Sequence, residues 1–455
     1  MPATPRVSEP GPTQAFAAHA AAARWRDIPP AAQAPTLRTV LNSTGCVLGA
    51  ARHPAVATIM EFAEPLSGPA KATVLGRGRR LDPVRAALVN GLAGSVHAFD
   101  DTHAHSIVHP GTPVTVAALA AAETAGGAPS GADLLNAVAW GLEITCRVSR
   151  AISAGMPMAL SQTGTVCTIG AAVSSGLLLG LDAPRLANAI GIAAASAAGI
   201  RAGHGTMTMH LLPARAASIG VEAALMAAAG CDSGTEALAG KHGFFAAFGG
   251  SASADGLFDD LGRRFELEAN TFKPYPCGVV AAPVIDACLQ LRERLGEAVA
   301  RATSVAILVA PAAVALADRA QPATELEAQV SLQHWAAVTL LTGRAGLDEG
   351  ALVFVAENAE VANLRGRCSL ETDVSLDVEQ AKVTLRMPDG GTETAEIRNA
   401  LGSLANPMSD AQLDAKFLAQ ASRTLGADGA ARALASCRAL ADAPDAAAFV
   451  RSLSA

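Results

Sequence analysis

Apolar residues recur at intervals of three and four over most of the first 262 residues, which is the period of helices that bury one face. The segment from Leu134 to Val148 shows this pattern, and Ser130 with Asp133 in front of it resembles a capping box. Three further Ala-rich segments behave in the same way: 114–125, 184–198 and 214–230. Their small side chains predict helices that pack closely together.

The pattern changes after Phe272. Two short, apolar, β-rich runs at 305–309 and 352–355 predict strands. Apolar and polar residues alternate over 383–387, before a Pro-Asp-Gly-Gly turn, and 392–397 is expected to be the return strand of a hairpin. The second part of the chain is therefore expected to be a smaller α+β domain.

These patterns together predict a mainly α fold in two domains. A large all-helical domain is expected at 15–269 and a smaller α+β domain at 270–402. The Pro-rich residues 1–14 are expected to form a disordered tail. Residues 403–455 return to helical periodicity and are expected to rejoin the helical domain.

Composition narrows the class of protein. Hydrophobic residues make up 51% of the 455 residues and charged residues only 16%, and the net charge of −7 leaves no basic field for nucleic acid. The nearest candidate for a membrane span, 163–181, is rich in Gly, Ser and Thr and is expected to be a buried helix. Because residues 1–12 show no secretory signal, we expect a cytoplasmic protein without a membrane or nucleic-acid partner.

A cluster of histidines is the first candidate site. Four of the ten histidines lie within thirteen residues, beside Asp100 and Asp101: His97, His103, His105 and His109. The proline after His109 predicts a loop that leads into a helix beginning after residue 112. A neutral imidazole can accept a proton at physiological pH and return it later. Metal ligation by His103 and His105 with carboxylates is the competing interpretation, and for each single histidine a capping or solvated role stays open.

Two further groups carry candidate chemistry. In the segment 272–278, two prolines fix Lys273, which can bind an anionic group, and Tyr275, which can donate a hydrogen bond. A structured domain linker is the alternative for this segment. A weaker group of polar residues lies in a Gly-containing connection at 199–212, where it borders either a pocket or solvent: Arg201, His204 and His210.

Four stretches match a known pattern: Phe-Asp-Asp-Thr-His at 99–103 with His109-Pro110, Thr-Gly-Thr-Val-Cys at 163–167, Arg-Ala-Ala-Ser-Ile-Gly at 215–220, and Lys-Pro-Tyr-Pro-Cys at 273–277. Together they resemble the MmgE/PrpD family. The resemblance extends over nearly the whole chain. The family includes 2-methylcitrate dehydratase, cis-aconitate decarboxylase and iminodisuccinate epimerase activities.

The resemblance implies a homodimer whose subunit has a helical domain, an α+β lid and an active site between them. It also implies a small anionic carboxylate substrate, no required metal and no organic cofactor. The shared step of the family is removal or delivery of a proton at a carbon next to a carboxylate. Such a step needs a positioned base, an acid and cations that hold the substrate carboxylates.

By position, Asp101, Thr102, His109 and Lys273 match family motifs, and the resemblance implies that they form the site. His109 is then expected as base or acid, with Asp101 and Thr102 orienting it or binding a substrate hydroxyl. Lys273, helped by Arg201, is expected to bind carboxylate. The other candidate catalytic residues are His103 as a second base or acid, and Tyr275 and His334 as opposing acids from the lid.

The sequence also departs from the decarboxylase pattern. Ala98 stands in place of an aspartate, Ser161 in place of a histidine, Met209 in place of a lysine and His334 in place of a tyrosine. Ser161 and His210, the latter next to Met209, remain candidate substrate-binding residues. The loss of a base candidate together with a cation argues against decarboxylation of cis-aconitate.

The sequence therefore predicts a cofactor-independent, dehydratase-like lyase that abstracts a proton α to a carboxylate of a small di- or tricarboxylate, such as a 2-methylcitrate-like acid. Epimerisation of an amino-dicarboxylate is the first alternative. A metal-dependent hydrolase that uses His103, His105 and Asp101, or a member that only binds its ligand, is the second.

Overall fold

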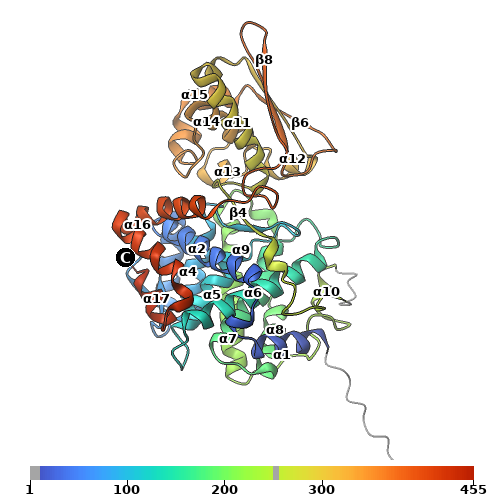
Figure 1. The fold of residues 1–455 in the computed structure, drawn as a ribbon, viewed down its shortest axis with the longest axis vertical. Coiled ribbons are helices and arrows are strands. Elements are labelled where there is room, and N and C mark those ends of the chain that lie inside the picture. The colour runs from blue at the N-terminus through green and yellow to red at the C-terminus, as the bar shows by residue number, and fades with distance from the viewer. Residues whose placement is uncertain (1–10, 250–255, 455) are drawn as a thin grey trace, which may run out of the picture.

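The computed structural model describes residues 11–249 and 256–454, and it shows two lobes joined near strand β4 (Figure 1). Helices take up 58% of the structure and strands 8%, which confirms the mainly α fold with a small sheet-containing C-terminal region. Of the expected tail, residues 1–10 lie outside the described residues. The expectation was wrong for residues 12–14, because they open helix α1.

The large lobe is built from ten helices before residue 250 and two after residue 409, within the described part of the chain. The helices are α1 (Pro12–Ala22), α2 (Pro30–Ala50), α3 (Pro54–Ala63), α4 (Pro83–Ser95), α5 (Gly111–Ala122), α6 (Gly131–Ile152), α7 (Gln162–Leu178), α8 (Ala183–Ala195), α9 (Met207–Ala228), α10 (Phe244–Ala247), α16 (Asp410–Arg438) and α17 (Ala446–Ser452). Short 3₁₀ turns connect them: η1 (Trp25–Asp27), η2 (Glu64–Leu66), η3 (Arg201–Gly203), η4 (Glu266–Ala269) and η8 (Leu440–Asp442).

Small residues let the helices of the large lobe approach closely. A side chain at Gly170 in α7 would clash with Thr145 and with the carbonyl of Gly141 in α6, so the contact between these helices requires glycine. The capping box of Ser130 and Asp133 begins α6 as the sequence predicts. Helices α4, α5, α7 and α9 pack against one another in the middle of the lobe.

One helix, α9, is long and apolar enough to cross a membrane by length and composition alone. In the structure it packs against α4, α7 and α8 within the helical lobe. The segment 163–181, considered from the sequence as a span, forms most of α7, whose residues are largely buried in the core.

The small lobe contains a four-stranded sheet in the order β6-β5-β7-β8. Its strands are β5 (Ser304–Val309), β6 (Cys368–Thr372), β7 (Ala381–Arg386) and β8 (Thr392–Ile397), and its helices and turns are η5 (Val279–Ala281), α11 (Ala282–Leu295), η6 (Gly296–Arg301), α12 (Pro311–Ala317), α13 (Glu325–Ala328), α14 (Leu332–Thr342), a π-helical turn η7 (Val353–Glu357) and α15 (Ala359–Arg365). Strands β5 and β6 are parallel and the other pairs are antiparallel. The β7–β8 hairpin agrees with the sequence prediction, whereas the strand expected at 352–355 is wrong because these residues are helical.

After the small lobe the chain returns to the large one. Helix α16 packs along α2, and α17 packs against α5 and α6 (Figure 1). Two further antiparallel strand pairs lie in or beside the large lobe. The hairpin of β1 (Ala72–Val74) and β2 (Arg79–Leu81) is local, whereas β3 (Asp101–His103) pairs with the distant β4 (Asn270–Phe272). The second pair corrects the prediction of a loop at the histidine cluster, and α5 begins at Gly111, two residues before the expected start at 113.

Candidate active site

The β3–β4 pair brings the histidine cluster next to the segment that contains Lys273. Asp101 pairs with Phe272 in antiparallel register, so the preceding Asp100 lies beside the following Lys273. The Lys273 Nζ donates to Asp100 Oδ1 at 2.5 Å and to the carbonyl of Ala98 at 3.3 Å. Both side chains are buried. Two segments that are about 170 residues apart in sequence thus form one buried ion pair.

The ion pair keeps Asp100 charged. Burial is the largest single effect and raises the pKa of this carboxyl, but the charge and hydrogen bond of Lys273, together with His109 and a backbone hydrogen bond, hold the pKa below its ordinary value of 3.8. An ammonium has three N–H donors, and two of those of Lys273 are already used. Lys273 therefore has one donor left for a substrate, and much of its charge is offset by Asp100.

His109 is held in one orientation by its Nδ1 atom. This nitrogen lies 2.8 Å from the carbonyl oxygen of Asp101 and 3.1 Å from Thr102 Oγ1. Because a carbonyl can only accept, Nδ1 carries the proton of the neutral ring and donates it. The backbone N–H of His109 donates to Thr163 Oγ1 at 3.1 Å, which fixes the residue from α7 as well.

The other ring nitrogen of His109 is free to act. Within residues 11–249 and 256–454, no group hydrogen bonds to Nε2. Burial and then the charge of Lys273 lower the pKa of His109 from 6.5 to about 4. The ring is therefore neutral at pH 7, with an unprotonated Nε2 that can accept a proton. The effects of Lys273 and Asp100 on His109 also show that the three groups lie within electrostatic reach of one another.

Asp101 has a supporting part in this arrangement. Its carboxylate accepts from the Gly111 N–H at 3.0 Å and from Asn270 Nδ2 at 2.5 Å, so it ties the start of α5 to β4. Burial and the neighbouring Asp100 raise its pKa to about 6. The carbonyl of Asp101, rather than its carboxylate, orients His109.

Arg201 and Ser161 lie on two connections that run side by side. Ser161 precedes α7, and Arg201 lies between α8 and α9. Arg201 is half-buried, has no ion pair among the described residues, and its charge contributes to lowering the pKa of His109. Its backbone N–H donates to the carbonyl of Ala159 at 2.8 Å, and Ser161 N–H donates to Gly199. The Ser161 hydroxyl caps α7 by accepting from the Gly164 N–H at 3.1 Å. Arg201 is thus the cation most available to a substrate, whereas Ser161 is occupied as a helix cap.

His210 lies in α9 instead of the expected connection, so the sequence placed it wrongly. Its Nδ1 atom is 3.1 Å from Ser95 Oγ in α4. Burial lowers its pKa to about 4, against the charge of Asp100, which raises it. His210 therefore lies near the Lys273–Asp100 pair but is held by α4.

Three sequence-predicted catalytic residues are not brought to His109. His103 is buried and uses both ring nitrogens, one with Ser106 Oγ at 2.7 Å and the other with the Glu266 carbonyl at 3.1 Å. Because successive strand residues face opposite sides, its side chain points away from that of Thr102. Its predicted part as a base or acid is therefore not supported by the geometry.

Tyr275 and His334 are likewise occupied within the small lobe. The Tyr275 hydroxyl donates to Asp286 Oδ1 at 2.6 Å, and burial raises its pKa above the ordinary value. His334 is fully buried in α14, where its Nε2 contacts the Glu349 carbonyl at 3.0 Å. The expectation that these two side chains supply the opposing acid is corrected, because the Tyr275 hydroxyl is bound to Asp286 and His334 is buried in the small lobe.

The group of possible metal ligands in the structure differs from the one expected from the sequence. His103, His105 and Glu266 offer ligand atoms within 4.8 Å of one another, and Asp101 is not part of this group. However, Glu266 Oε1 already accepts from Arg150 at 2.6 Å and from Arg264 at 2.7 Å. Two guanidinium groups on this carboxylate compete with a cation, so the residues present do not fit a metal well.

The structure adds one residue that the sequence did not single out. Lys416 in α16 is buried, and its ammonium donates to the carbonyls of Phe99 at 2.7 Å and Lys273 at 2.8 Å and to Asn42 Oδ1 at 2.7 Å. Burial lowers its pKa to about 8. Lys416 thus fastens together the two segments that carry Asp100 and Lys273. The available signal was its rarity, since the chain has only five lysines.

Comparison with known proteins finds similarity along most of the chain. Residues 14–256 match the MmgE/PrpD N-terminal domain, and residues 275–442 match the MmgE/PrpD C-terminal domain. The chain is 28% identical to cis-aconitate decarboxylase of Homo sapiens over 383 residues, which cover 81% of this chain and 79% of the human protein. It is 27% identical to cis-aconitate decarboxylase of Mus musculus over 406 residues, which cover 86% of this chain and 83% of the mouse protein.

Proposed function

Because the chain belongs to the MmgE/PrpD family, we propose that it is a lyase that removes a proton from the carbon next to a carboxylate of a small di- or tricarboxylate. The observation that carries the proposal is the neutral ring of His109, with Nδ1 bound to Asp101 and Nε2 unprotonated. The similarity to two decarboxylases that are lyases supports the same class of reaction.

In the proposed first step, His109 Nε2 accepts the proton from the α-carbon. The electron pair of the broken C–H bond moves into the adjacent carboxylate, which becomes enediolate-like. Arg201 and the remaining N–H of Lys273 stabilise the charge that builds on its oxygens. Thr102 and Asp101 keep the imidazole in place while it gains a positive charge.

In the proposed second step, the electron pair returns to form a carbon–carbon double bond and a β-hydroxyl leaves. Tyr275 and His334 already have hydrogen-bond partners inside the small lobe, so the protonated His109 serves as the acid. It gives its proton to the leaving hydroxyl, which departs as water, and the ring becomes neutral again. One imidazole can therefore serve both halves of a dehydration.

Decarboxylation is the second candidate, and the similarity to two cis-aconitate decarboxylases favours it. Against it, Ser161 caps a helix and Met209 carries no charge, although decarboxylases of the family have a histidine and a lysine at these positions. For this reason we propose dehydration first.

The test uses citrate-like and amino-dicarboxylate acids with the protein in deuterated water. Water release with deuterium at the α-carbon of recovered substrate supports dehydration, and release of carbon dioxide supports the second candidate. Exchange with inverted configuration and no elimination would instead indicate an epimerase. The His109→Gln variant is expected to lose exchange, whereas the half-exposed His105 in the same loop offers the matched control His105→Gln. Full exchange in His109→Gln would refute the proposed base.

A further inference from the structure

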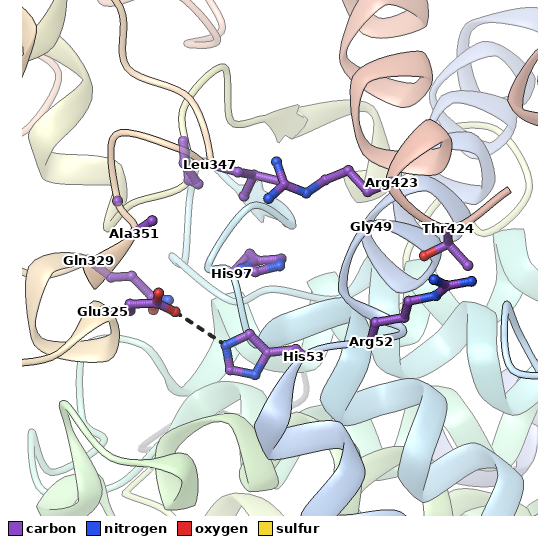
Figure 2. Close-up of a pocket in the computed structure, with 12 residues that line it drawn as sticks. Gly49, Arg52, His53, His97, Glu325, Gln329, Leu347, Ala351, Arg423 and Thr424 are labelled. Carbon is purple, nitrogen blue, oxygen red and sulfur yellow. Dashed lines mark ion pairs between the residues drawn. The ribbon is translucent and has the colours of Figure 1, made fainter. Parts of the chain in front are cut away.

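A cavity lies between the two lobes, and it is distinct from the surroundings of His109. It has a volume of about 230 Å³ and includes Arg52, His53, His97 and Arg423 from the large lobe and Glu325 and Gln329 from the small lobe in its lining (Figure 2). His109, Thr102 and Lys273 do not line it, as far as the described residues show. Cavities at domain boundaries are common ligand sites, and this volume suits a small metabolite.

Two guanidinium groups give the cavity its anionic preference. Figure 2 shows Arg52 and Arg423 on the large-lobe side of the cavity, opposite Glu325 and Gln329, with Arg423 reaching towards His97 and Arg52 pointing towards Thr424. Arg52 makes no ion pair or side-chain hydrogen bond within the described ranges, while Arg423 Nη1 lies 2.8 Å from Asp348 Oδ1 in an exposed pair. Exposed pairs are weak, so Arg423 can exchange this partner for a ligand at small cost.

Two histidines lie between these walls. The rings of His53 and His97 meet edge to face with centroids 5.2 Å apart. His53 Nδ1 accepts from the Ala55 N–H at 3.1 Å, and its Nε2 lies 3.7 Å from Glu325 Oε2. In contrast, no described group hydrogen bonds to the ring of His97. Burial lowers the pKa of His97 to about 3, so at pH 7 the neutral ring offers one donor and one acceptor to an occupant.

The polar groups that line the cavity favour a ligand that has a hydrogen-bonding group in addition to its negative charge. Arginine binds carboxylate or phosphate oxygens, whereas Glu325 on the opposite wall repels negative charge placed next to it and accepts hydrogen bonds instead. A hydroxyl or amino group on the ligand would satisfy Glu325 or the unpartnered His97. We propose that this cavity binds a small hydroxy- or amino-carboxylate such as malate or aspartate, with its carboxylates towards Arg52 and Arg423 and its hydroxyl or amino group towards Glu325 and His97.

An occupant of this cavity would act on the position of the candidate active site. His97 is three residues before Asp100, and Pro276, which also lines the cavity, is three residues after Lys273. Gln329 Nε2 donates to the carbonyl of Val96 at 2.7 Å, so the small lobe already contacts the loop that carries Asp100. A ligand that bridges the lobes here stabilises the approach of the segments that hold the Lys273–Asp100 pair. This inference does not depend on the proposed reaction.

The test measures ligand-induced stabilisation without turnover. In the His109→Gln protein, malate and aspartate at millimolar concentration are expected to raise Tm, because binding to the folded state stabilises it. Succinate, which lacks the hydroxyl or amino group, and inorganic phosphate are expected to raise Tm less. Adding Arg52→Gln and Arg423→Gln is expected to weaken malate binding by about tenfold or more, as charge-assisted hydrogen bonds are lost.

The matched control is Arg26→Gln, whose side chain is 86% exposed and lies outside the cavity. It should leave the malate effect unchanged. The proposal is overturned if no compound raises Tm, if succinate or phosphate acts as strongly as malate, or if the Arg52→Gln/Arg423→Gln protein keeps the full malate effect. Product formation is not measured, so failure here is separate from failure of the proposed lyase reaction.

Discussion

His103 and His109 lie six residues apart in one stretch of chain, and burial lowers the pKa of both to about 4. Their hydrogen bonds nevertheless differ. His103 uses both ring nitrogens, with Ser106 and the Glu266 carbonyl, whereas His109 uses only Nδ1. A lowered pKa therefore does not identify the base. The nitrogen that the fold leaves without a partner does.

The cause of the difference is the alternation of side chains along strand β3, whose last residue is His103. In β3, Thr102 and His103 face opposite sides, so only the side of Thr102 faces His109. The same register places Asp100 next to Lys273 on the far side of Asp101. The direction in which each side of this short strand faces thus distinguishes a structural histidine from a candidate catalytic one.

The largest expected effect separates the two histidines by activity. His109→Gln should lower kcat/KM by about 10²- to 10⁴-fold, because the proton acceptor is lost. His103→Gln should lower the free energy of unfolding by about 1–3 kcal/mol, because Ser106 and the Glu266 carbonyl lose buried hydrogen bonds. The folded protein should keep most of its activity. Steady-state kinetics and urea unfolding on both variants check this contrast. If both variants were folded to the same extent and lost activity equally, the distinction between the two histidines would be wrong.

The second expected effect concerns the buried ion pair. Lys273→Met leaves Asp100 as an unpaired buried charge and should destabilise the fold by about 3–5 kcal/mol. Asp100→Asn should also destabilise the fold. The double variant, Lys273→Met with Asp100→Asn, should lower the free energy of unfolding by clearly less than the sum of the two single variants. Urea unfolding of the three variants measures the coupling. Simple additivity would show that the two side chains do not depend on each other.

The third expected effect tests Lys416 as a positioning residue. Lys416→Met removes the donor shared by the carbonyls of Phe99 and Lys273, and should destabilise the fold by about 1–3 kcal/mol. Because the segments around the ion pair then shift, kcat should fall more than KM changes. The exposed Lys382 provides the control Lys382→Met, which should alter neither value. Identical kinetics in the two variants would show that Lys416 does not position the candidate active site.

The smallest expected effect is on the pH dependence of stability. The folded pKa of about 4 lies below the ordinary 6.5, so between these values the unfolded chain binds more protons at His103 and His109. The free energy of unfolding should therefore fall as pH drops from 6.5 towards 4. Each histidine adds up to about 1.4 kcal/mol per pH unit, and replacing either by Gln should make the fall shallower. Asp101, with its pKa raised to about 6, acts in the opposite direction. A slope unchanged in both variants would contradict these pKa directions.

Much of the helical fold was predictable because it depends on local patterns. The capping box at Ser130 and the β7–β8 hairpin follow from a few neighbouring residues. The run at 352–355 was misassigned because a short apolar stretch fits a strand or a helix equally well. A stronger failure concerns β3, whose three residues pair with a strand about 170 residues later.

The candidate site was predicted only in part for the same reason. Family motifs in the sequence pointed to His109 and Lys273, and the structure brings these residues together. The sequence did not show that Tyr275 bonds Asp286, that His334 faces the small-lobe core, or that Lys416 fastens both segments. Each of these facts depends on which side of an element a residue faces and on a partner supplied by the tertiary fold.

The central claim is that His109 is neutral, with its proton on Nδ1 and Nε2 free. Nitrogen-15 NMR of the histidine-labelled protein tests this directly, with the His109 signals identified by their loss in His109→Gln. At pH 7 the account predicts the Nδ1–H tautomer, and on acidification a pKa near 4. A proton on Nε2 at pH 7, or a pKa at or above 6.5, would contradict it.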